Sequence, residues 1–383
     1  MNRSSFSVIL LPTLHCDARC DYCFEDTTTG RMDLKAFSAL LEKIFDFMDE
    51  RNIELVNLYW QGGEVFTLSP EWFYTAAHQM HVIAERRGRN LANYLQSNLL
   101  AYSDKWEPVV RNVFGGSIGT SMDFPNLHRR MPGRSPREYT AIWMKNVQQV
   151  LAAGFTMGVI AVPSVETLKA GAQAFYDFFV QKAGINEFQV NPPFPGGTAN
   201  EAKQSLPLDP FELGNFLVEL SDIWLDHGFH NGVKVGPLSE ILDYFLHGDT
   251  VIPCFWQANC ANNFICIDPK GNVSQCDCWV ASYPNMHFGN IFEASSLTAL
   301  LKSNPVRQKF LDRPGILVQS RDCAECDHLA FCHGGCPVRA YSTHDTLFEK
   351  DPYCETYKRL FSHLEKAARR FASSRVSDVK LMK

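Results

Sequence analysis

Short apolar runs alternate with longer stretches of helical period along the first 230 residues of the chain. The short runs are rich in β-branched and aromatic residues, which is typical of buried strands, whereas the longer stretches repeat apolar residues every three to four positions. Six strands are predicted in this way, at residues 6–12, 54–60, 91–96, 116–122, 157–162 and 187–191. The alternation of strand and helix predicts an α/β fold with a parallel sheet.

Polar capping residues mark the starts of several predicted helices. Asp33 precedes the segment LKAFSALLEKIFDF, and an aspartate at this position accepts hydrogen bonds from the first free N–H groups of a helix. Ser69 and Asp209 are each followed by proline, which suits the first helical turn. Ser135 and Glu138 have the spacing of a capping box. These signals separate the predicted helices from the strands before them.

The position of the polar motifs distinguishes between two kinds of parallel sheet. A doubly wound sheet and a barrel both alternate strands with helices, but a barrel carries its functional residues after its strands, at the carboxyl-terminal mouth. In this chain the segments CDARCDYC, QGGE, QSN, TSMD and NPPFPGG each follow or end a predicted strand. We therefore expect a curved, partial (β/α)6 TIM-like barrel over residues 1–235.

A cysteine-rich region follows the predicted barrel. Ten cysteines lie in the segment from Cys254 to Cys354, among turn-rich stretches, and helical periodicity returns only over residues 357–371. This composition is typical of a small domain that is held together by metal. We expect this domain over residues 236–370 and a polar tail over residues 371–383.

Composition and charge narrow the class of protein. The chain has 383 residues, 36 basic and 42 acidic side chains and a formal net charge of −6, so it lacks the basic excess of nucleic-acid-binding proteins. No apolar stretch reaches the length of about eighteen residues that indicates a membrane-spanning helix, and the N-terminal segment shows no small-residue cleavage site. We therefore expect a cytoplasmic protein that binds neither nucleic acid nor a membrane. In a reducing compartment, its thirteen cysteines indicate metal binding or catalysis rather than disulfides.

Three cysteines of the barrel region, Cys16, Cys20 and Cys23, form a closely spaced triplet, and the next cysteine is Cys254. A structural zinc site takes four protein ligands, whereas a [4Fe–4S] cluster that is held by three thiolates keeps one iron open. His15 adjoins Cys16 and would have to turn back on the same ion to complete a zinc site. The triplet therefore favours an iron–sulfur cluster with an open iron.

This triplet, with Tyr22 directly before its last cysteine and a predicted strand before its first, resembles the signature of the radical S-adenosylmethionine (radical SAM) enzymes. The resemblance implies that Cys16, Cys20 and Cys23 hold a [4Fe–4S] cluster whose open iron chelates the amino and carboxylate groups of SAM. It also implies that an electron from the cluster cleaves SAM to methionine and a 5′-deoxyadenosyl radical.

Three further motifs agree with this family. QGGE resembles the GGE segment, in which the bare backbone of Gly62 and Gly63 and the carboxylate of Glu64 would receive the SAM ammonium. QSN, with Asn98, resembles the TNG segment, and GTSMD, with Ser121, resembles the SLDG segment, both of which lie near the ribose. The SAM-binding residues that the resemblance implies are Tyr22, Gly62, Gly63, Glu64, Asn98 and Ser121.

The cysteines of the C-terminal region resemble those of the SPASM domain, which carries two auxiliary [4Fe–4S] clusters. By motif, the first auxiliary cluster takes Cys254, Cys260, Cys276 and Cys336. The second takes Cys323, Cys326, Cys332 and Cys354. With the triplet, this makes three [4Fe–4S] clusters. Cys266 is left over and is expected in the core, and Cys278 would face the same side as Cys276 and could compete for the iron.

Asp277 lies between these two cysteines. In the anaerobic sulfatase-maturating enzymes, a subgroup that the chain resembles, an aspartate directly after the corresponding cysteine takes a proton from the substrate thiol or hydroxyl. The resemblance implies the role of general base for Asp277, and a carboxylate beside an anionic cluster should have a raised pKa. An Asx turn or a cap of the cluster loop would also explain an aspartate at this position.

Three departures from this subgroup bear on the substrate. Val65 follows QGGE where proline is usual, Phe124 follows SMD where glycine is usual, and Phe24 and Glu25 follow the triplet where an aromatic pair is common. Together with a similarity to ribosomal-peptide maturases, the departures favour a radical SAM/SPASM enzyme that oxidises a residue of a peptide or protein, or crosslinks it through a C–C, C–O or thioether bond.

Other functions stay open at this point. Formylglycine formation in a sulfatase is the first alternative, and dehydrogenation or epimerisation of a small sugar or aminocyclitol is the second. An iron–sulfur electron carrier would explain neither the missing fourth ligand of the triplet nor the QGGE segment. The expected partners are a peptide or protein substrate and a flavodoxin- or ferredoxin-type reductant.

Overall fold

The computed structural model describes residues 4–25, 28–194, 206–248, 252–258 and 260–381. Within these residues, ten strands form one sheet in the order β10-β9-β8-β1-β2-β3-β4-β5-β6-β7, and β1 to β7 run parallel. Their bounds are β1 Ser5–Thr13, β2 Leu55–Gly62, β3 Asn90–Ser97, β4 Ser117–Ser121, β5 Thr156–Ala161, β6 Glu187–Val190 and β7 Lys234–Gly236. The first six confirm the predicted strands, whereas the sequence pattern does not predict β7. The segment NPPFPGG is described only as far as Phe194.

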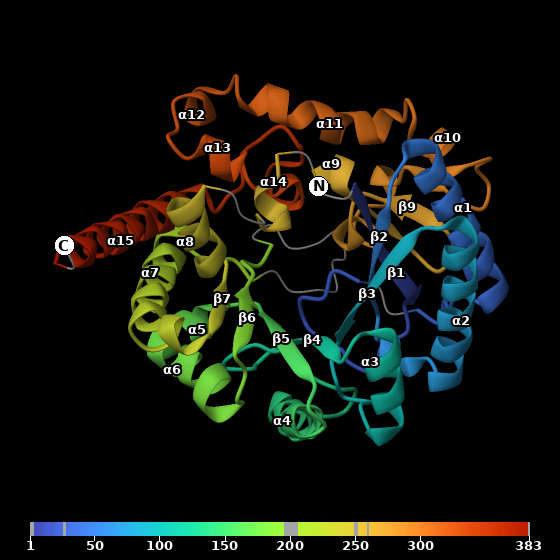
Figure 1. Ribbon diagram of the computed structural model, residues 1–383, viewed down its shortest axis with the longest axis horizontal. Helices are drawn as coiled ribbons and strands as arrows, with labels where there is room; N and C mark the ends of the chain where they lie inside the picture. Colours follow the sequence, from blue (N-terminus) through green and yellow to red (C-terminus); the bar gives the residue numbers. More distant parts are fainter. Residues whose placement is uncertain (1–3, 26–27, 195–205, 249–251, 259, 382–383) are drawn as a thin grey trace.

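Helices cover the outer face of the curved parallel sheet (Figure 1). They are α1 Leu34–Arg51, α2 Pro70–Arg87, α3 Glu107–Val113, α4 Pro136–Ala152, α5 Val165–Ala170, α6 Ala172–Asp177, α7 Pro210–His227 and α8 Leu238–His247. The helix starts predicted after Asp33, Ser69, Ser135 and Asp209 are confirmed. Each of these four side chains accepts a hydrogen bond from a backbone N–H of the first turn, which is why the helices begin there.

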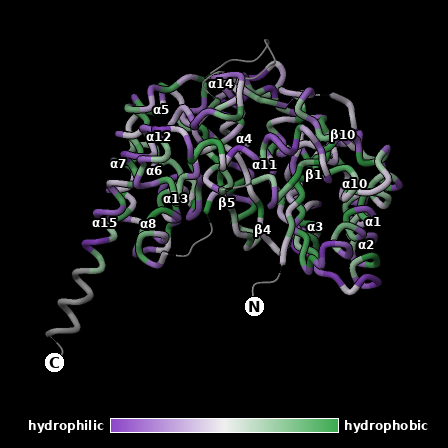
Figure 2. The backbone as a smooth tube through the Cα atoms, turned by 90° about the horizontal axis from the view of Figure 1, so that it is seen from above, coloured by the Kyte–Doolittle hydropathy of each residue, from purple (hydrophilic) through white to green (hydrophobic). Residues whose placement is uncertain are grey.

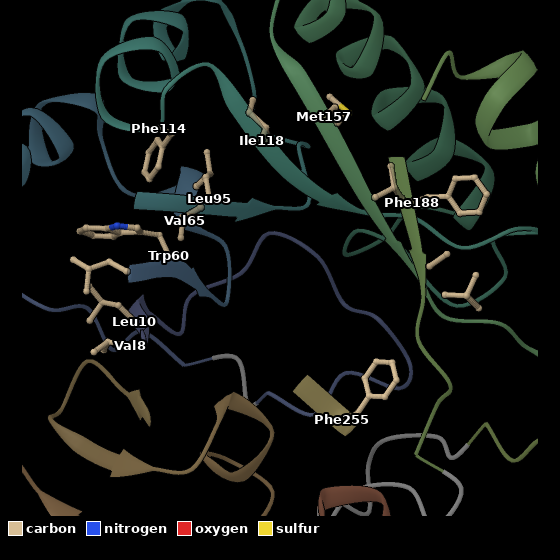
Figure 3. Close-up of a cluster of buried hydrophobic side chains, with 14 of the residues drawn as sticks. Val8, Leu10, Trp60, Val65, Leu95, Phe114, Ile118, Met157, Phe188 and Phe255 are labelled. Carbon is tan, nitrogen blue, oxygen red and sulfur yellow. The ribbon is translucent and has the colours of Figure 1, made fainter. Parts of the chain in front are cut away.

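The main hydrophobic core lies between the sheet and these outer helices (Figure 3). On β2, the alternate residues Val56, Leu58 and Trp60 are fully buried, and the ring of Trp60 packs against Phe37 of α1 and Phe73 of α2. Hydrophobic and hydrophilic residues alternate along peripheral helices such as α1 and α7 (Figure 2), as expected for helices with one buried face. Because the outward face of the sheet is packed in this way, the inner face and the strand ends remain for a site.

The cysteine-rich region continues the same sheet. β8 (Phe264–Ile267) pairs in parallel with β1, and β9 (Asn272–Ser274) and β10 (Gly289–Asn290) follow as antiparallel strands. The further helices are α9 Cys260–Asn263, α10 Leu297–Leu301, α11 Pro305–Leu317, α12 Arg321–Ala324, α13 Leu329–Cys332, α14 Pro337–His344 and α15 Cys354–Leu381. The two proposed domains, 1–235 and 236–370, therefore share one sheet.

Helix α15 returns to the barrel and packs along α7 and α8, as Figure 1 shows. The hydroxyl of Thr356 donates to the carbonyl of Pro210 at 2.6 Å. A Cβ on Gly214 of α7 would lie 3.2 Å from Cδ of Arg359, so the glycine allows the two helices to approach closely. The helix continues to Leu381, past the residue at which a polar tail is expected to begin.

Candidate functional site

The cysteine triplet lies in the loop after β1, and backbone hydrogen bonds tie this loop to residues 128–130. The side chains of Cys16, Cys20 and Cys23 are half-buried. Burial raises the pKa of the Cys16 thiol, and the negative charge of Glu64 raises it further. A bound metal cluster offsets this cost, because its positive charge lies within bonding distance of the thiolate. Three such thiols in one loop fit three ligand positions of a [4Fe–4S] cluster.

The QGGE segment packs directly on this loop. The N–H of Gly63 donates to the carbonyl of Thr13 at 2.9 Å. The N–H of Glu64 donates to the carbonyl of His15 at 2.8 Å. A Cβ on Gly62 or on Gly63 would lie 2.4 Å from one of these two carbonyl oxygens. Glycine is therefore required for the close backbone approach that places the end of β2 against the triplet loop.

The carboxylate of Glu64 is almost completely buried, with 2% of the residue exposed, and three donors hold it. Its Oε1 accepts from the N–H of Phe66 at 2.9 Å and from the hydroxyl of Ser97 at 2.7 Å. Its Oε2 accepts from the N–H of Asn98 at 2.6 Å. Burial and then the charge of Asp17 raise the pKa of Glu64 to about 7. One lone pair of Oε2 is left for a further donor such as an ammonium.

Asp17 belongs to the same site, although no motif in the sequence marks it. The Nδ2 of Asn98 donates to Oδ1 of Asp17 at 2.7 Å, and the same nitrogen lies 3.8 Å from Sγ of Cys16. Asp17 and Glu64 therefore place two carboxylates beside the triplet loop. Two negative charges that lie close together favour a cationic ligand between them. A carboxylate next to the first cysteine of the triplet is the signal that could have identified Asp17.

Tyr22 and Ser121, the other predicted SAM-binding residues, are held by neighbouring side chains. The hydroxyl of Tyr22 donates to Oδ2 of Asp123 at 2.6 Å. The Nε of Arg129 donates to the same oxygen at 2.9 Å, and its guanidinium lies 5.5 Å from the centre of the Tyr22 ring. Tyr22 thereby anchors the triplet loop to the end of β4. The Oγ of Ser121 accepts from Nε2 of Gln96 at 2.8 Å. Direct contact of Tyr22 or Ser121 with SAM stays a prediction.

Four of the C-terminal thiols form one group. Desolvation raises the pKa of the Cys260 thiol most, and the negative charges of three further thiolates raise it more. These neighbours are Cys276, Cys336 and Cys254. Thiols that affect one another in this way must lie close together, since such interactions weaken with distance. The group matches the predicted ligand set of the first auxiliary cluster, although its binding of iron stays a prediction.

The other four thiols form a second group around α13. Desolvation, followed by negative charges that include Cys354 and Cys326, raises the pKa of Cys332 to about 12. Cys323 lies one turn before Cys326, whose N–H donates to the carbonyl of Cys323 at 3.1 Å. The structure thus places Cys326 and Cys354 near Cys332, with Cys323 one turn before Cys326, and their binding of the second auxiliary cluster stays a prediction.

The two leftover cysteines differ in their surroundings. Cys266 is fully buried in β8 and packs among apolar side chains, as expected for a core residue. In contrast, the ligand atoms of Cys276, Asp277 and Cys278 all lie within 4.8 Å of one another. Cys278 therefore lies close enough to Cys276 to compete with it for the iron, and which of the two thiols is the ligand stays a prediction.

A hydrogen bond between Gln61 and Asp277 joins the barrel to the C-terminal region. The Nε2 of Gln61 donates to Oδ2 of Asp277 at 2.6 Å, and Gln61 directly precedes the two glycines of QGGE. Burial raises the pKa of Asp277 above its ordinary value. A half-buried carboxylate with a raised pKa suits a proton acceptor. The contact also explains how QGGE and the Cys276 loop keep their relative positions.

Comparisons with known proteins define the class in which this fold and these thiols occur. Residues 250–327 match the SPASM family, described as an iron–sulfur cluster-binding domain. A structure of anSMEcpe with bound AdoMet aligns with a TM-score of 0.81 and 20% identity, over 96% of this chain and 99% of that chain. Streptococcus suis SuiB bound to precursor peptide SuiA aligns with a TM-score of 0.60 and 13% identity, over 92% and 76%. Residues 250–327 thus match the SPASM domain, and the fold of the chain resembles that of these radical SAM/SPASM structures.

Within this class the chain is similar to anaerobic sulfatase-maturating enzymes. The cysteine-type enzyme of Clostridium perfringens is 23% identical over 363 residues, which cover 91% of this chain and 93% of the relative. The serine-type enzyme of Bacteroides thetaiotaomicron is 26% identical over 375 residues, which cover 91% and 86%. The comparisons support the expected resemblance and the expected cofactors, iron–sulfur clusters and SAM. Among the helices of the described residues, none combines the length and the apolar character needed to cross a bilayer.

Proposed function

We propose that this protein is a radical SAM/SPASM enzyme that oxidises the β-carbon of a cysteine or serine residue in a peptide or protein segment to the aldehyde, as in formylglycine formation. The hydrogen bond between Gln61 and Asp277 carries the proposal. It puts a half-buried carboxylate beside the segment that would bind SAM and beside the first auxiliary thiol group. Similarity to both cysteine-type and serine-type maturating enzymes supports the same reaction.

The donor sets described above fit the groups that this reaction needs. The triplet would hold one cluster, and the two C-terminal thiol groups would hold two more. Gly62, Gly63 and Glu64 would receive the SAM ammonium, and Asn98, which is held by Glu64, would lie near the ribose. When bound, these groups supply a carbon radical that removes a hydrogen atom from the substrate and a sink for one electron. Asp17 and Glu64 would contribute negative charge opposite the SAM ammonium.

The chain itself must remove a proton, because oxidation of the β-carbon takes a hydrogen atom, a proton and an electron from the substrate. Serine then becomes the aldehyde directly, whereas cysteine becomes a thioaldehyde, which water hydrolyses to the aldehyde with release of hydrogen sulfide. Asp277 is the group that we assign to the proton. Its raised pKa makes the ionised carboxylate a stronger base than an exposed aspartate. Gln61 donates to only one of the two carboxylate oxygens, Oδ2. This hydrogen bond orients the carboxylate, and Oδ1, which lies 3.9 Å from the weakly donating thiol of Cys278, would accept the substrate proton.

Radical crosslinking of a ribosomally made peptide is the second candidate, although the sequence pattern alone ranks it first. Two of the three sequence departures that favour crosslinking are side chains that pack against other parts of the protein. Val65 is fully buried, and Phe124 stacks on Phe178 with ring centres 4.7 Å apart. Only Phe24, whose ring lies 6.0 Å from that of Phe194, comes from the triplet loop itself. We therefore place β-carbon oxidation ahead of crosslinking.

The test is product analysis after anaerobic reconstitution with iron, sulfide, SAM and a chemical reductant. Peptides that carry one cysteine or one serine are incubated with the protein, treated with an aldehyde-reactive hydrazide and examined by mass spectrometry. An aldehyde at the cysteine or serine supports β-carbon oxidation. Loss of two hydrogens without a hydrazide adduct supports crosslinking. Release of 5′-deoxyadenosine with every peptide unchanged would count against both peptide reactions and in favour of a small-molecule substrate.

A further inference from the structure

Two large aromatic side chains are exposed side by side on the sheet. Tyr59 of β2 is 40% exposed, and Tyr94 of β3 is 47% exposed. The strand register pairs the two residues, and their rings stack with centres 4.8 Å apart and an angle of 16° between their planes. The proposed function uses neither of these rings.

The alternation of side chains along each strand shows which face of the sheet carries the rings. Side chains at successive positions of a strand point to opposite faces. Trp60 of β2 and Leu95 of β3 are buried in the core under the outer helices. Each of these residues directly follows one of the tyrosines. Tyr59 and Tyr94 therefore point to the inner face of the sheet, and so does Gln61.

The rings adjoin the reaction site of the proposed function. Gln61, whose amide donates to Asp277, lies two residues after Tyr59 in β2. A strand rises about 3.3 Å per residue, so the Cα atoms of Tyr59 and Gln61 are about 7 Å apart. Burial raises the pKa of Tyr59 above its ordinary value, and the neighbouring Tyr94 and the Cys254 thiolate raise it further. Tyr59 thus lies near both the assigned proton acceptor and the first auxiliary thiol group.

The two rings are held in place, yet part of their surface is free. Ser7 of β1 forms a hydrogen bond with the hydroxyl of Tyr59, and the two rings cover one another by stacking. Fixed, exposed aromatic surface beside a reaction site is typical of a position that binds part of a ligand. Aromatic rings favour a further ring, stacked or edge-on, because their faces are electron-rich and their edges electron-poor. The pair therefore suits an aromatic group of the ligand better than an aliphatic one.

We propose that Tyr59 and Tyr94 bind an aromatic side chain of the peptide substrate. The inference rests on the proposed peptide-modifying function and adds a specificity site to it. In an extended peptide, side chains two residues apart point to the same side, and their Cα atoms are also about 7 Å apart. A peptide that places its cysteine or serine at Asp277 would therefore reach the rings with the side chain two residues away.

The experiment measures peptide binding to the anaerobically reconstituted protein with SAM, by fluorescence anisotropy. The probes are labelled peptides with one central cysteine and one phenylalanine at varied distances from it. Matched peptides carry leucine in place of the phenylalanine, because leucine is apolar but has no ring. This comparison is made first in the wild type, so it tests the inference even if a variant fails to fold.

The variants separate the rings from their hydroxyls. Tyr59→Phe and Tyr94→Phe keep the rings, whereas Tyr59→Leu, Tyr94→Leu and the combination of these two replace the rings by aliphatic side chains. Tyr74→Leu is the matched control, because Tyr74 is 41% exposed but lies on the outer helix α2. Iron content and SAM affinity are measured for each variant.

The wild type should bind the phenylalanine peptide about threefold to tenfold more tightly than the leucine peptide, as expected for one aromatic pair. The difference should be largest at a spacing of two residues. The phenylalanine variants and Tyr74→Leu should keep this preference, and the double leucine variant should lose it with SAM affinity unchanged. Equal binding of both peptides at every spacing would overturn the inference, as would a preference that persists in the double variant. A fall in SAM affinity in the double variant would also overturn it, since the rings would then belong to the SAM site.

Product analysis of the same peptides separates this inference from the proposed function. Phenylalanine-dependent binding without any modified peptide would support the aromatic site and count against peptide oxidation. Aldehyde formation with equal binding of the phenylalanine and leucine peptides would support peptide oxidation and overturn the aromatic site.

Discussion

The ionisation of Glu64 predicts a pH-dependent contribution to the stability of the metal-free protein. Burial, and then the charge of Asp17, raises the pKa of this carboxyl from 4.5 to about 7. A carboxyl whose pKa is higher in the folded state stabilises the fold fully below its unfolded pKa, and the contribution is lost as the pH rises through the folded value. A difference of about 2.5 pKa units corresponds to about 3 kcal/mol. Most of this contribution should disappear between about pH 5 and pH 8.

The assay is urea unfolding of the metal-free protein across this pH range, for the wild type and for Glu64→Gln. Because the variant cannot ionise at this position, its free energy of unfolding should fall by about 2–3 kcal/mol less than that of the wild type over this pH range. It should be less stable at low pH, because its amide nitrogen cannot accept from the N–H of Asn98. Asp17→Asn, which removes the second cause of the raised pKa, should reduce the slope in part. Identical slopes in the wild type and Glu64→Gln would refute the reasoning.

The remaining predictions concern the clusters and the proton acceptor. Asp277→Asn should keep the iron content and the release of 5′-deoxyadenosine but lower product by roughly 10²–10⁴-fold, measured by chromatography of both products; full product yield would exclude Asp277 as the base. The reconstituted protein should contain about twelve irons, and about eight after the triplet is changed to alanine, with SAM cleavage abolished; zinc in place of iron would contradict the cluster assignment. If Cys276 is the cluster ligand, Cys278→Ala should keep the full iron content and Cys276→Ala should lose iron. If Cys278→Ala instead contains less iron than Cys276→Ala, Cys278 is the ligand.

Features that depend on neighbours along the chain could be predicted from the sequence. The caps at Asp33, Ser69 and Ser135 form because the side chain and the N–H groups that it meets lie within three residues of each other. The six longer strands of the barrel are recognisable from their apolar runs for the same reason. β7 has three residues, too few for any periodicity, and so it is absent from the prediction.

The triplet and QGGE could be assigned to one site because both follow strands of a parallel sheet, whose carboxyl ends meet at one mouth. The same rule does not indicate which side chains touch within the site. Asp17 meets Asn98, and Tyr22 meets Asp123, through hydrogen bonds between loops that are 81 and 101 residues apart in the sequence. Nothing in either local pattern marks the partner.

The tertiary structure alone decided how the two regions share one site. The contact between Gln61 and Asp277 spans 216 residues, and it exists because β8 of the cysteine-rich region pairs with β1 of the barrel. The alignment of Gln96 with Gly119 and of Gln189 with Gly236 likewise requires the register of neighbouring strands, in which residues from separate segments lie side by side. Short-range preferences determine where strands and helices begin, whereas which distant residues meet depends on the packing of the whole sheet, and no single segment of the sequence encodes it.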